Sequence, residues 1–178
     1  MATIPGTRTW SVGEYFTATR ANTELRDAED FLLNVPACHV WDSVGVSLIN
    51  ATATLLTWDS EIFDTDAMHS IASNTSRITF TTAGTYVIKI NLSVPGATYT
   101  VFSINWRLNA AGSSSGGTSL RSESFDDHTM QNVGTWIWER AFTGGDYIEA
   151  FVTQTSGANR TTDAFSLGTY AEARFVSI

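Results

Sequence analysis

The stretch that decides the fold is Arg77-Ile-Thr-Phe-Thr-Thr-Ala-Gly-Thr-Tyr-Val-Ile-Lys-Ile-Asn-Leu-Ser-Val94. A period of two in β-branched and aromatic residues is typical of a half-buried β-strand and excludes an amphipathic helix. Pro95-Gly96 ends the strand, because proline lacks the amide donor of the ladder and glycine allows a turn. We therefore expect a central strand of a β-sandwich, with one side made by Tyr86, Ile88, Ile90, Leu92 and Val94.

Short alternating segments separated by turn signals continue from Ala37 to Ile178, with no helical pattern between them. About ten strands at this spacing predict an all-β fold, an antiparallel sandwich or jelly roll, over residues 37–178. The predicted strands are Ala37–Asp42, Val46–Ile49, Leu55–Trp58, Arg77–Phe80, Thr85–Val94, Tyr99–Asn109, Leu120–Phe125, Met130–Phe142, Asp146–Gln154 and Phe165–Val176.

Residues 1–36 have a different pattern. Met1–Glu14 shows no period and is expected to be an extended arm, and Thr17 is a candidate N-cap for one short helix over Ala18–Leu33. Asn34 and Pro36 end that helix. Its apolar stripe has the spacing of a coiled-coil seam: Ala18, Ala21, Leu25, Ala28 and Leu32. The stripe either packs on its own domain, or it self-associates around a symmetry axis or docks into a larger assembly.

Charge and composition exclude several function classes. A net charge of −8 with a single lysine, Lys89, argues against nucleic acid, since phosphate binding needs clustered cations. The single Cys38 excludes an internal disulfide framework and is expected to be a small buried residue. No signal-peptide pattern and no apolar run of membrane length occurs, so neither ordinary secretion nor a membrane location is expected.

Aromatic residues are abundant for so few charges, at 12% against 16%. They form either a large aromatic core or a surface hidden between subunits. Two consecutive predicted strands carry mixed faces. In the second of them, Tyr147, Glu149 and Phe151 share one side of the strand, and aliphatic residues share the other. This pattern favours burial on one side in the sandwich and on the other against a neighbouring copy. The candidates for the core or a trimer interface are Tyr86, Phe102, Trp106, Trp136, Trp138, Phe142, Tyr147 and Phe151.

Two acidic segments are weak candidates for a metal site. Asp64 and Asp66 precede His69 within one loop, which could hold a divalent cation or form an Asx-type turn with polar caps. Asp126 and Asp127 are expected in a second loop, which could bind calcium or simply be solvated. In both places we favour the reading without a metal. No nucleophile elbow, zinc helix or Cys–His pairing is present, so no catalytic residue, no cofactor and no enzymatic activity are expected.

One motif resembles a known family. Ile78, five residues, then Gly84-x-Tyr86-x-Ile88-x-Ile90 is similar to the C1q/TNF-type jelly-roll pattern of an aromatic, five residues and Gly-x-Tyr-x-Phe. The downstream Phe142-Thr-Gly-Gly-Asp-Tyr-Ile-Glu-Ala150 resembles the later signature of that family. Isoleucines replace the usual phenylalanines and Gly144 replaces an alanine, which puts the subfamily in doubt. The resemblance covers roughly Val40 to the end and implies homotrimers packed through aromatic-rich sheet faces.

The N-terminal segment resembles a head segment of virion proteins of tailed bacteriophages, over about thirty residues. There a Trp–Gly–Glu/Asp arm leads into a Thr-Ala-x-x-x-Asn helix that ends in an Arg-Asp and an apolar pair. The resemblance implies that the segment attaches the protein to a neighbouring particle protein. The anchoring candidates are Trp10, Glu14, Leu25, Arg26, Asp27, Phe31 and Leu32.

Together the two resemblances predict a non-enzymatic homotrimer on the surface of a phage particle, attached by its N-terminus and displaying a jelly-roll head. It would be a capsid decoration protein or head fibre. The alternatives are a tail-tip or tail-fibre protein that recognises a host surface glycan or protein, and a monomeric carbohydrate-binding module. Receptor binding predicts exposed aromatic residues in the loops Thr65–Asn74, Ala111–Asp127 or Thr155–Asp163. These are mostly Ser, Gly, Thr and Asp, with Phe125 as the exception.

Overall fold

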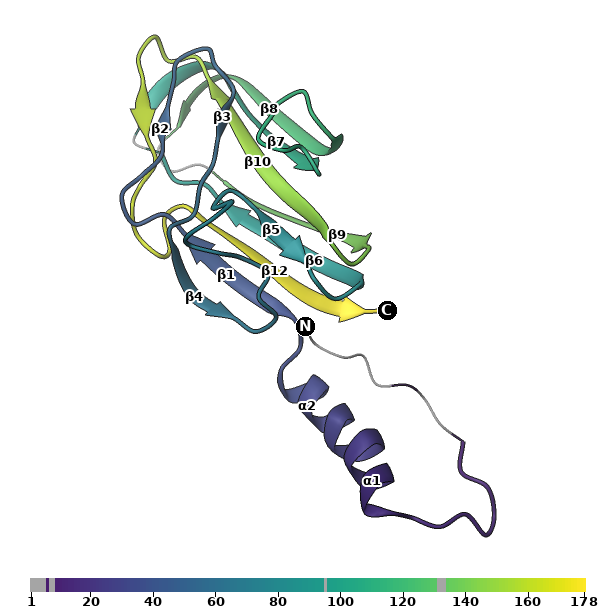
Figure 1. Cartoon of the computed structure of the whole chain (residues 1–178). Coiled ribbons are helices and arrows are strands. Elements are labelled where there is room, and N and C mark those ends of the chain that lie inside the picture. The colour runs from purple at the N-terminus through teal and green to yellow at the C-terminus, as the bar shows by residue number, and fades with distance from the viewer. Residues whose placement is uncertain (1–5, 7–8, 95, 131–133) are drawn as a thin grey trace.

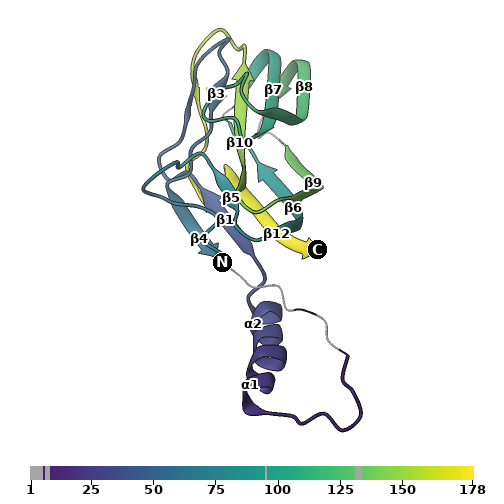
Figure 2. The ribbon, with the colours of Figure 1, turned by 45° about the vertical axis from the view of Figure 1, so that its right-hand side comes forward.

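A helical segment projects from one end of two facing β-sheets (Figures 1 and 2). The computed structural model describes Gly6 and residues 9–94, 96–130 and 134–178, and for residues 125–130 it describes the backbone alone. Each of the two large sheets has five strands in this part of the chain, and a small third sheet pairs β2 with β11. The short strands of the third sheet are Ser47–Leu48 and Arg160–Thr161.

The first sheet, which we call the β12 sheet, is antiparallel and has the order β4-β1-β12-β6-β9. Its strands are β1 (Ala37–Trp41), β4 (Ser60–Asp64), β6 (Gly84–Asn91), β9 (Thr135–Phe142) and β12 (Tyr170–Ser177). The sequence alternation of β6 is repeated in the structure, where Tyr86, Ile88 and Ile90 are buried and their neighbours are half-buried. Gly84 begins the strand with φ +155°, and a Cβ there would overlap the Phe175 ring, so β6 approaches β12 closely only without a side chain.

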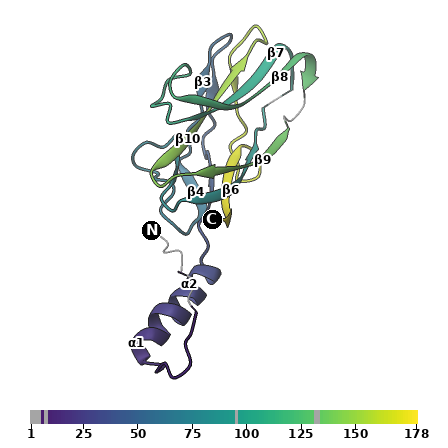
Figure 3. The same cartoon turned by 90° about the vertical axis from the view of Figure 1, so that its right-hand side faces the viewer.

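The second sheet, which we call the β10 sheet, has the order β3-β10-β7-β8, and β5 also pairs with β10. Its strands are β3 (Thr54–Leu55), β5 (Ile78–Phe80), β7 (Ala97–Leu108), β8 (Thr118–Met130) and β10 (Asp146–Gln154). The two sheets face each other across the core (Figure 3). The prediction of an all-β antiparallel sandwich is confirmed.

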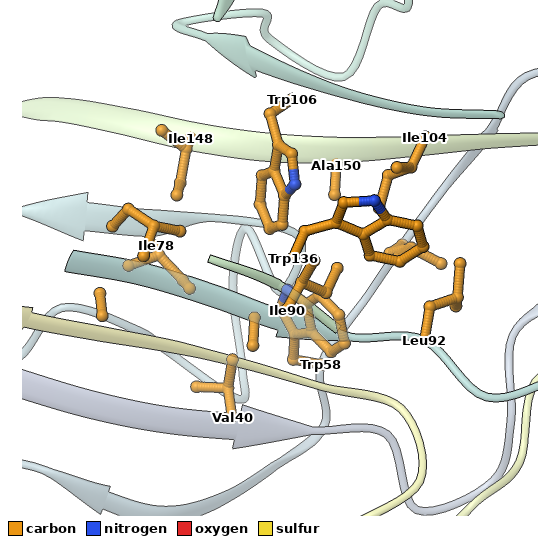
Figure 4. Packing of buried hydrophobic residues seen from close by; sticks show 14 of the residues in the cluster. Val40, Trp58, Ile78, Ile90, Leu92, Ile104, Trp106, Trp136, Ile148 and Ala150 are labelled. Carbon is orange, nitrogen blue, oxygen red and sulfur yellow. The ribbon is translucent and has the colours of Figure 1, made fainter. Parts of the chain in front are cut away.

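The core lies between the sheets and takes side chains from both (Figure 4). Trp106 and Ile148 reach into it from the β10 sheet, and Val40 and Ile90 from the β12 sheet (Figure 4). The Phe80 and Phe142 rings are stacked with centroids 3.7 Å apart, and the Tyr86 hydroxyl donates to the Thr82 carbonyl at 2.7 Å. Aromatic rings therefore close the sandwich within one copy of the chain.

Several strand predictions need correction. β4 was not predicted, because its pairing with β1 contains a bulge between His39 and Val40 and its residues do not alternate. Asp126, Asp127 and His128 were expected in a loop, but β8 continues to Met130 and the ladder places Asp126 opposite Val101. The predicted start of β9 was too early, since the strand begins at Thr135, and residues 131–133 lie outside the described residues. β12 likewise begins at Tyr170 rather than at Phe165, and β11 was not predicted.

The predicted helix forms, but a π-turn interrupts it. It consists of α1 (Ala18–Ala21), the π-helical η1 (Asn22–Arg26) and α2 (Asp27–Leu33). Thr17 is the N-cap, and its hydroxyl accepts from the Arg20 amide at 3.3 Å. Hydrogen bonds from residue i to i+5 add residues to the turn, so positions before and after it no longer keep heptad spacing. The stripe predicted from Ala18 to Leu32 is therefore not a continuous coiled-coil seam.

The turn between β9 and β10 gives a testable dependence of stability on pH. Burial acts to raise the pKa of Asp146, but hydrogen bonds from Asn109 Nδ2 at 2.9 Å and from Thr143 Oγ1 at 2.7 Å outweigh it and hold the pKa below its ordinary value of 3.8. A carboxylate with a lowered folded-state pKa stabilises the fold above its unfolded pKa, and the stabilisation is lost as pH falls through the folded pKa. We expect Asp146→Asn to lower the urea midpoint at pH 7. The urea midpoints of this variant at pH 7 and at about pH 3 should differ less than those of the wild type. An equal loss at both pH values would contradict this role.

Candidate functional site

The aromatic candidates lie mostly in the core of a single copy. Six of them are buried within this chain: Tyr86, Phe102, Trp106, Trp136, Phe142 and Phe151. Trp138 packs half-buried against the same core, with its ring centroid 6.3 Å from that of Trp106. Tyr147 is half-buried on the outer face of the β10 sheet, under the guanidinium of Arg77, whose Cζ is 4.1 Å from the ring centroid. The aromatic content therefore does not by itself require a subunit interface.

The outer face of β10 is covered by loops of the same chain, which corrects the expectation of a neighbouring copy there. Glu149 is only 1% exposed and accepts hydrogen bonds from Ser76 Oγ at 2.8 Å, Arg77 Nε at 3.3 Å and the Gly112 amide at 2.9 Å. One buried carboxylate thus holds the segment before β5 and the β7–β8 loop against the sheet.

The outer face of the β12 sheet is covered only in part by the described residues, because the segment before β12 lies over His39, whose Nε2 is 3.3 Å from the Ser166 carbonyl oxygen. The rest of this outer face is the first candidate interaction surface. We call it the β12 face. A groove of about 320 Å³ on it has an apolar floor made by Val87, Ile137, Phe175 and Val176. Ile137 is 59% exposed and Val176 is 50% exposed. A second groove of about 240 Å³, on the side of Leu33 and Phe63, shares Glu172 and Arg174 with the first.

Polar contacts order the middle of the β12 face. The His39 ring stacks on Tyr170 with centroids 4.6 Å apart, and Lys89 Nζ lies 5.0 Å from the centroid of the same Tyr170 ring. Lys89 Nζ and Glu172 Oε2 are 3.9 Å apart. The Tyr170 hydroxyl raises the pKa of Lys89 against the opposing effect of burial, so the lysine stays charged. Arg174 and Glu139 form no ion pair with any residue that the structure describes.

The sequence reasoning missed the β12 face, although its signal was present. In β12 the inward positions are the small Ala171 and Ala173, while Tyr170, Glu172 and Arg174 occupy the outward ones. Large and charged residues on the outward positions of a strand indicate a surface with a partner or a solvated face, although Phe175 of the same strand packs against the core. The interface prediction rested on large aromatic residues, and the β12 face carries few of them.

The N-terminal segment is the second candidate surface, and the structure places the anchoring candidates on it. Trp10 is 43% exposed with its ring 5.6 Å from Phe16, Leu25 is 52% exposed and Leu32 is 73% exposed. Phe31 instead packs edge-on against Phe175 of the head at 5.4 Å. The charged candidates are used internally, in the ion pairs Glu14–Arg20 at 2.7 Å and Arg26–Asp27 at 2.9 Å.

Other apolar side chains of this segment are exposed and were not predicted as anchors: Val12, Tyr15, Phe16 and Leu33. No helix in the described ranges is long and apolar enough to cross a bilayer.

The acidic loop after β4 forms turns. Asp64 accepts from the amides of Asp66, Met68 and His69 at 2.9–3.1 Å. The buried Asp66 accepts from the hydroxyls of Thr81 and Thr82 at 2.5 and 2.7 Å. These carboxylates are used as hydrogen-bond acceptors for the chain itself. Among the described residues no cluster of three or more His, Cys, Asp or Glu side chains is arranged to hold a metal ion, and the side chains of Asp126 and Asp127 lie outside them.

Comparisons with known proteins bear on the fold. No family model and no curated protein matches the sequence. Among solved structures, murine APRIL is similar with a TM-score of 0.59 at 10% identity, over 79% of this chain and 98% of that chain. Eiger TNF from S. frugiperda is similar with a TM-score of 0.54 at 13% identity, over 80% of this chain and 94% of that chain. The C1q/TNF-like jelly roll is therefore confirmed, and nothing in these comparisons indicates a phage origin.

Proposed function

We propose that this chain is a non-enzymatic structural protein of a tailed-phage virion. In this proposal it is a homotrimer that the N-terminal segment attaches to the particle, and its jelly-roll head is displayed as a capsid decoration or head fibre. The observation that carries the proposal is the contrast between a head closed on its own core and a projecting helix that leaves its leucines in solvent (Figure 1).

Attachment is supported by the apolar side chains of the helix that remain exposed. Leu25, Leu32 and Leu33 are 52–79% exposed, whereas Phe31 of the same helix packs against Phe175 of the head. Burying a leucine side chain is worth about 1.5–3 kcal/mol, so an exposed group of three favours a partner. The resemblance to phage virion segments names the kind of partner, a neighbouring particle protein.

A homotrimer is supported by the β12 face together with the resemblance to a family of trimers. The face has an apolar groove, and it carries both a cation and an anion, Arg174 and Glu139, that have no ion-pair partner in the described part of the chain. In a threefold assembly each copy contacts the next through two different parts of its surface, and a face that carries both signs beside an apolar floor can supply both parts. We therefore propose that the trimer seam lies on the β12 face rather than on the aromatic residues, most of which are buried within one copy.

A charged residue in the groove is expected to break the trimer. Ile137→Asp would place a carboxylate on the groove floor, and we expect the trimer to dissociate at least 10-fold more readily, since a desolvated unpaired charge costs several kcal/mol. Sedimentation velocity at several micromolar concentrations measures this. The matched control is Ile71→Asp, because Ile71 is equally exposed at 58% but lies in the loop before β5. Equal behaviour of the two variants would move the seam to another face.

Deletion of residues 1–34 tests the attachment separately. The remaining head should keep its folded state and its trimeric mass but should no longer sediment with particles. A truncated head that dissociates would mean that the helix belongs to the trimer core. An image of particles labelled at the C-terminus would then decide between the capsid and the tail.

Receptor binding is the second candidate, favoured by one loop. Phe165 is 52% exposed and Leu167 is 71% exposed, both in the segment before β12. Exposed apolar side chains in a head loop suit contact with a host glycan or protein. Loss of cell adsorption in Phe165→Ser, with particle attachment unchanged, would support this function.

A further inference from the structure

We propose that the partner of the N-terminal helix is a protein groove that is apolar and carries a lysine or arginine between two apolar pockets, and that the partner is not a second copy of this chain. The inference rests on the proposed attachment function and deepens it, because it names the chemistry of the surface to which the helix binds.

The exposed leucines lie on one face of the helix. Glu29, Leu32 and Leu33 are neighbours on the surface of α2, at spacings of three and four, and Leu25 precedes them in the π-turn. The leucines are 52%, 73% and 79% exposed in chain order, and Glu29 is also exposed. Exposed apolar side chains that lie close together on a helix suit a helix that binds in an apolar groove of its partner.

The other sides of the helix are already used by this chain. Arg20 donates to the Tyr15 carbonyl at 2.9 Å and pairs with Glu14, which holds the arm against the start of the helix. Phe31 faces Phe175 of the head. The exposed leucines are therefore left for a partner, although Leu33 also borders the groove of about 240 Å³ beside Phe63 of the head.

A second copy is a poor occupant for this face. The π-turn Asn22–Arg26 interrupts the heptad spacing that a coil of identical helices requires. Symmetric association through the leucine face would also bring Glu29 close to Glu29 of each other copy, and like charges at short range repel. A helix with only two turns of leucine contacts gains too little from self-association to offset the broken spacing and the repulsion between Glu29 side chains.

The charge on the face specifies the partner instead. Glu29 and Asp30 form no ion pair with the residues that the structure describes, whereas Arg26 is neutralised by Asp27 at 2.9 Å. α2 has three acidic residues in its first turn and no basic residue in its last. A carboxylate set between Leu25 and Leu33 is stabilised on binding only if the groove offers a cation there.

The test uses the full chain and particles assembled without it. Binding is measured by co-sedimentation, with the molar mass of each variant determined in parallel. We expect Leu25→Ser with Leu33→Ser to weaken particle binding about 100-fold and to leave the mass of the free protein unchanged. We expect Glu29→Lys to weaken binding about 10-fold or more, and Glu29→Gln to bind with an affinity between those of the wild type and Glu29→Lys. The affinity of the wild type for the particle should fall as the salt concentration rises. Ile71→Ser is the control, with matched exposure on the head.

The outcomes are distinguishable. A fall in the mass of the free leucine variant would overturn the proposal by showing that a second copy occupies the face. Unchanged or tighter binding of Glu29→Lys would overturn the cationic groove, and full binding of the leucine variant would overturn the leucine face. If the wild-type chain binds no particles at all, the attachment function itself fails and the proposal falls with it.

Discussion

Replacement of Trp106 by alanine is expected to lower the free energy of unfolding of the head by about 3–5 kcal/mol. Trp106 is 2% exposed and projects from β7 into the space between the sheets (Figure 4). Its ring centroid is 6.3 Å from that of Trp138 in the opposite sheet. Loss of the indole removes a large buried apolar area and leaves a cavity that two facing sheets cannot close. Urea unfolding followed by far-UV circular dichroism measures the change.

Phenylalanine at the same position separates ring volume from the indole N–H. Trp106 Nε1 is buried without a hydrogen-bond partner, so Trp106→Phe removes an unsatisfied donor together with part of the ring. We expect that variant to lose about 1.5 kcal/mol or less. Trp10→Ala, on the exposed arm, should leave the midpoint unchanged. A loss in Trp106→Phe as large as that in Trp106→Ala would show that Nε1 has a partner in solution.

Replacement of Glu149 by alanine is expected to cost about 2–4 kcal/mol, which is large for a residue on the outer face of a sheet. The carboxylate is buried and accepts from Ser76, Arg77 and Gly112, so its removal leaves three donors from two loops without their acceptor. The cost falls below that of a fully buried ion pair because the Arg77 side chain is 26% exposed and keeps partial hydration.

The accompanying loss of order should be local. Amide hydrogen exchange of the β7–β8 loop and of the segment before β5 should accelerate in Glu149→Ala, because that carboxylate joins them. Glu149→Gln keeps one acceptor oxygen and the side-chain volume, so about half of the destabilisation is expected. Unchanged exchange in both segments would contradict the role of Glu149 as the group that holds the loops.

The sequence allowed prediction of the sandwich because its central strands are locally specified. Tyr86, Ile88 and Ile90 alternate with half-buried neighbours, and the Gly-Gly-Asp turn before Tyr147 carries its own geometry. β8 was not predicted beyond Phe125, because its acidic residues have no local preference for a strand and are kept extended by the ladder with β7. β4 was not predicted for the same reason, and its pairing with β1 also contains a bulge.

The candidate surfaces were harder to predict, because burial on the second side of a strand depends on distant segments. The sequence showed that Glu149 shares a strand face with aromatic residues. It did not show that Glu149 accepts hydrogen bonds from two segments that lie 37 and 73 positions away in the chain. Exposure of the leucine face depends on where the arm lies, and the π-turn has no signature in the sequence. Alternation specifies which residues share a side, and tertiary packing decides what covers it.

We propose that two further copies of this chain cover the β12 face. The molar mass of the full-length protein, measured by light scattering during size-exclusion chromatography at micromolar concentration, tests it most directly. The account predicts three times the chain mass of 19.4 kDa, and a shift toward the single-chain mass in Ile137→Asp. A wild-type protein that elutes at 19.4 kDa would contradict it.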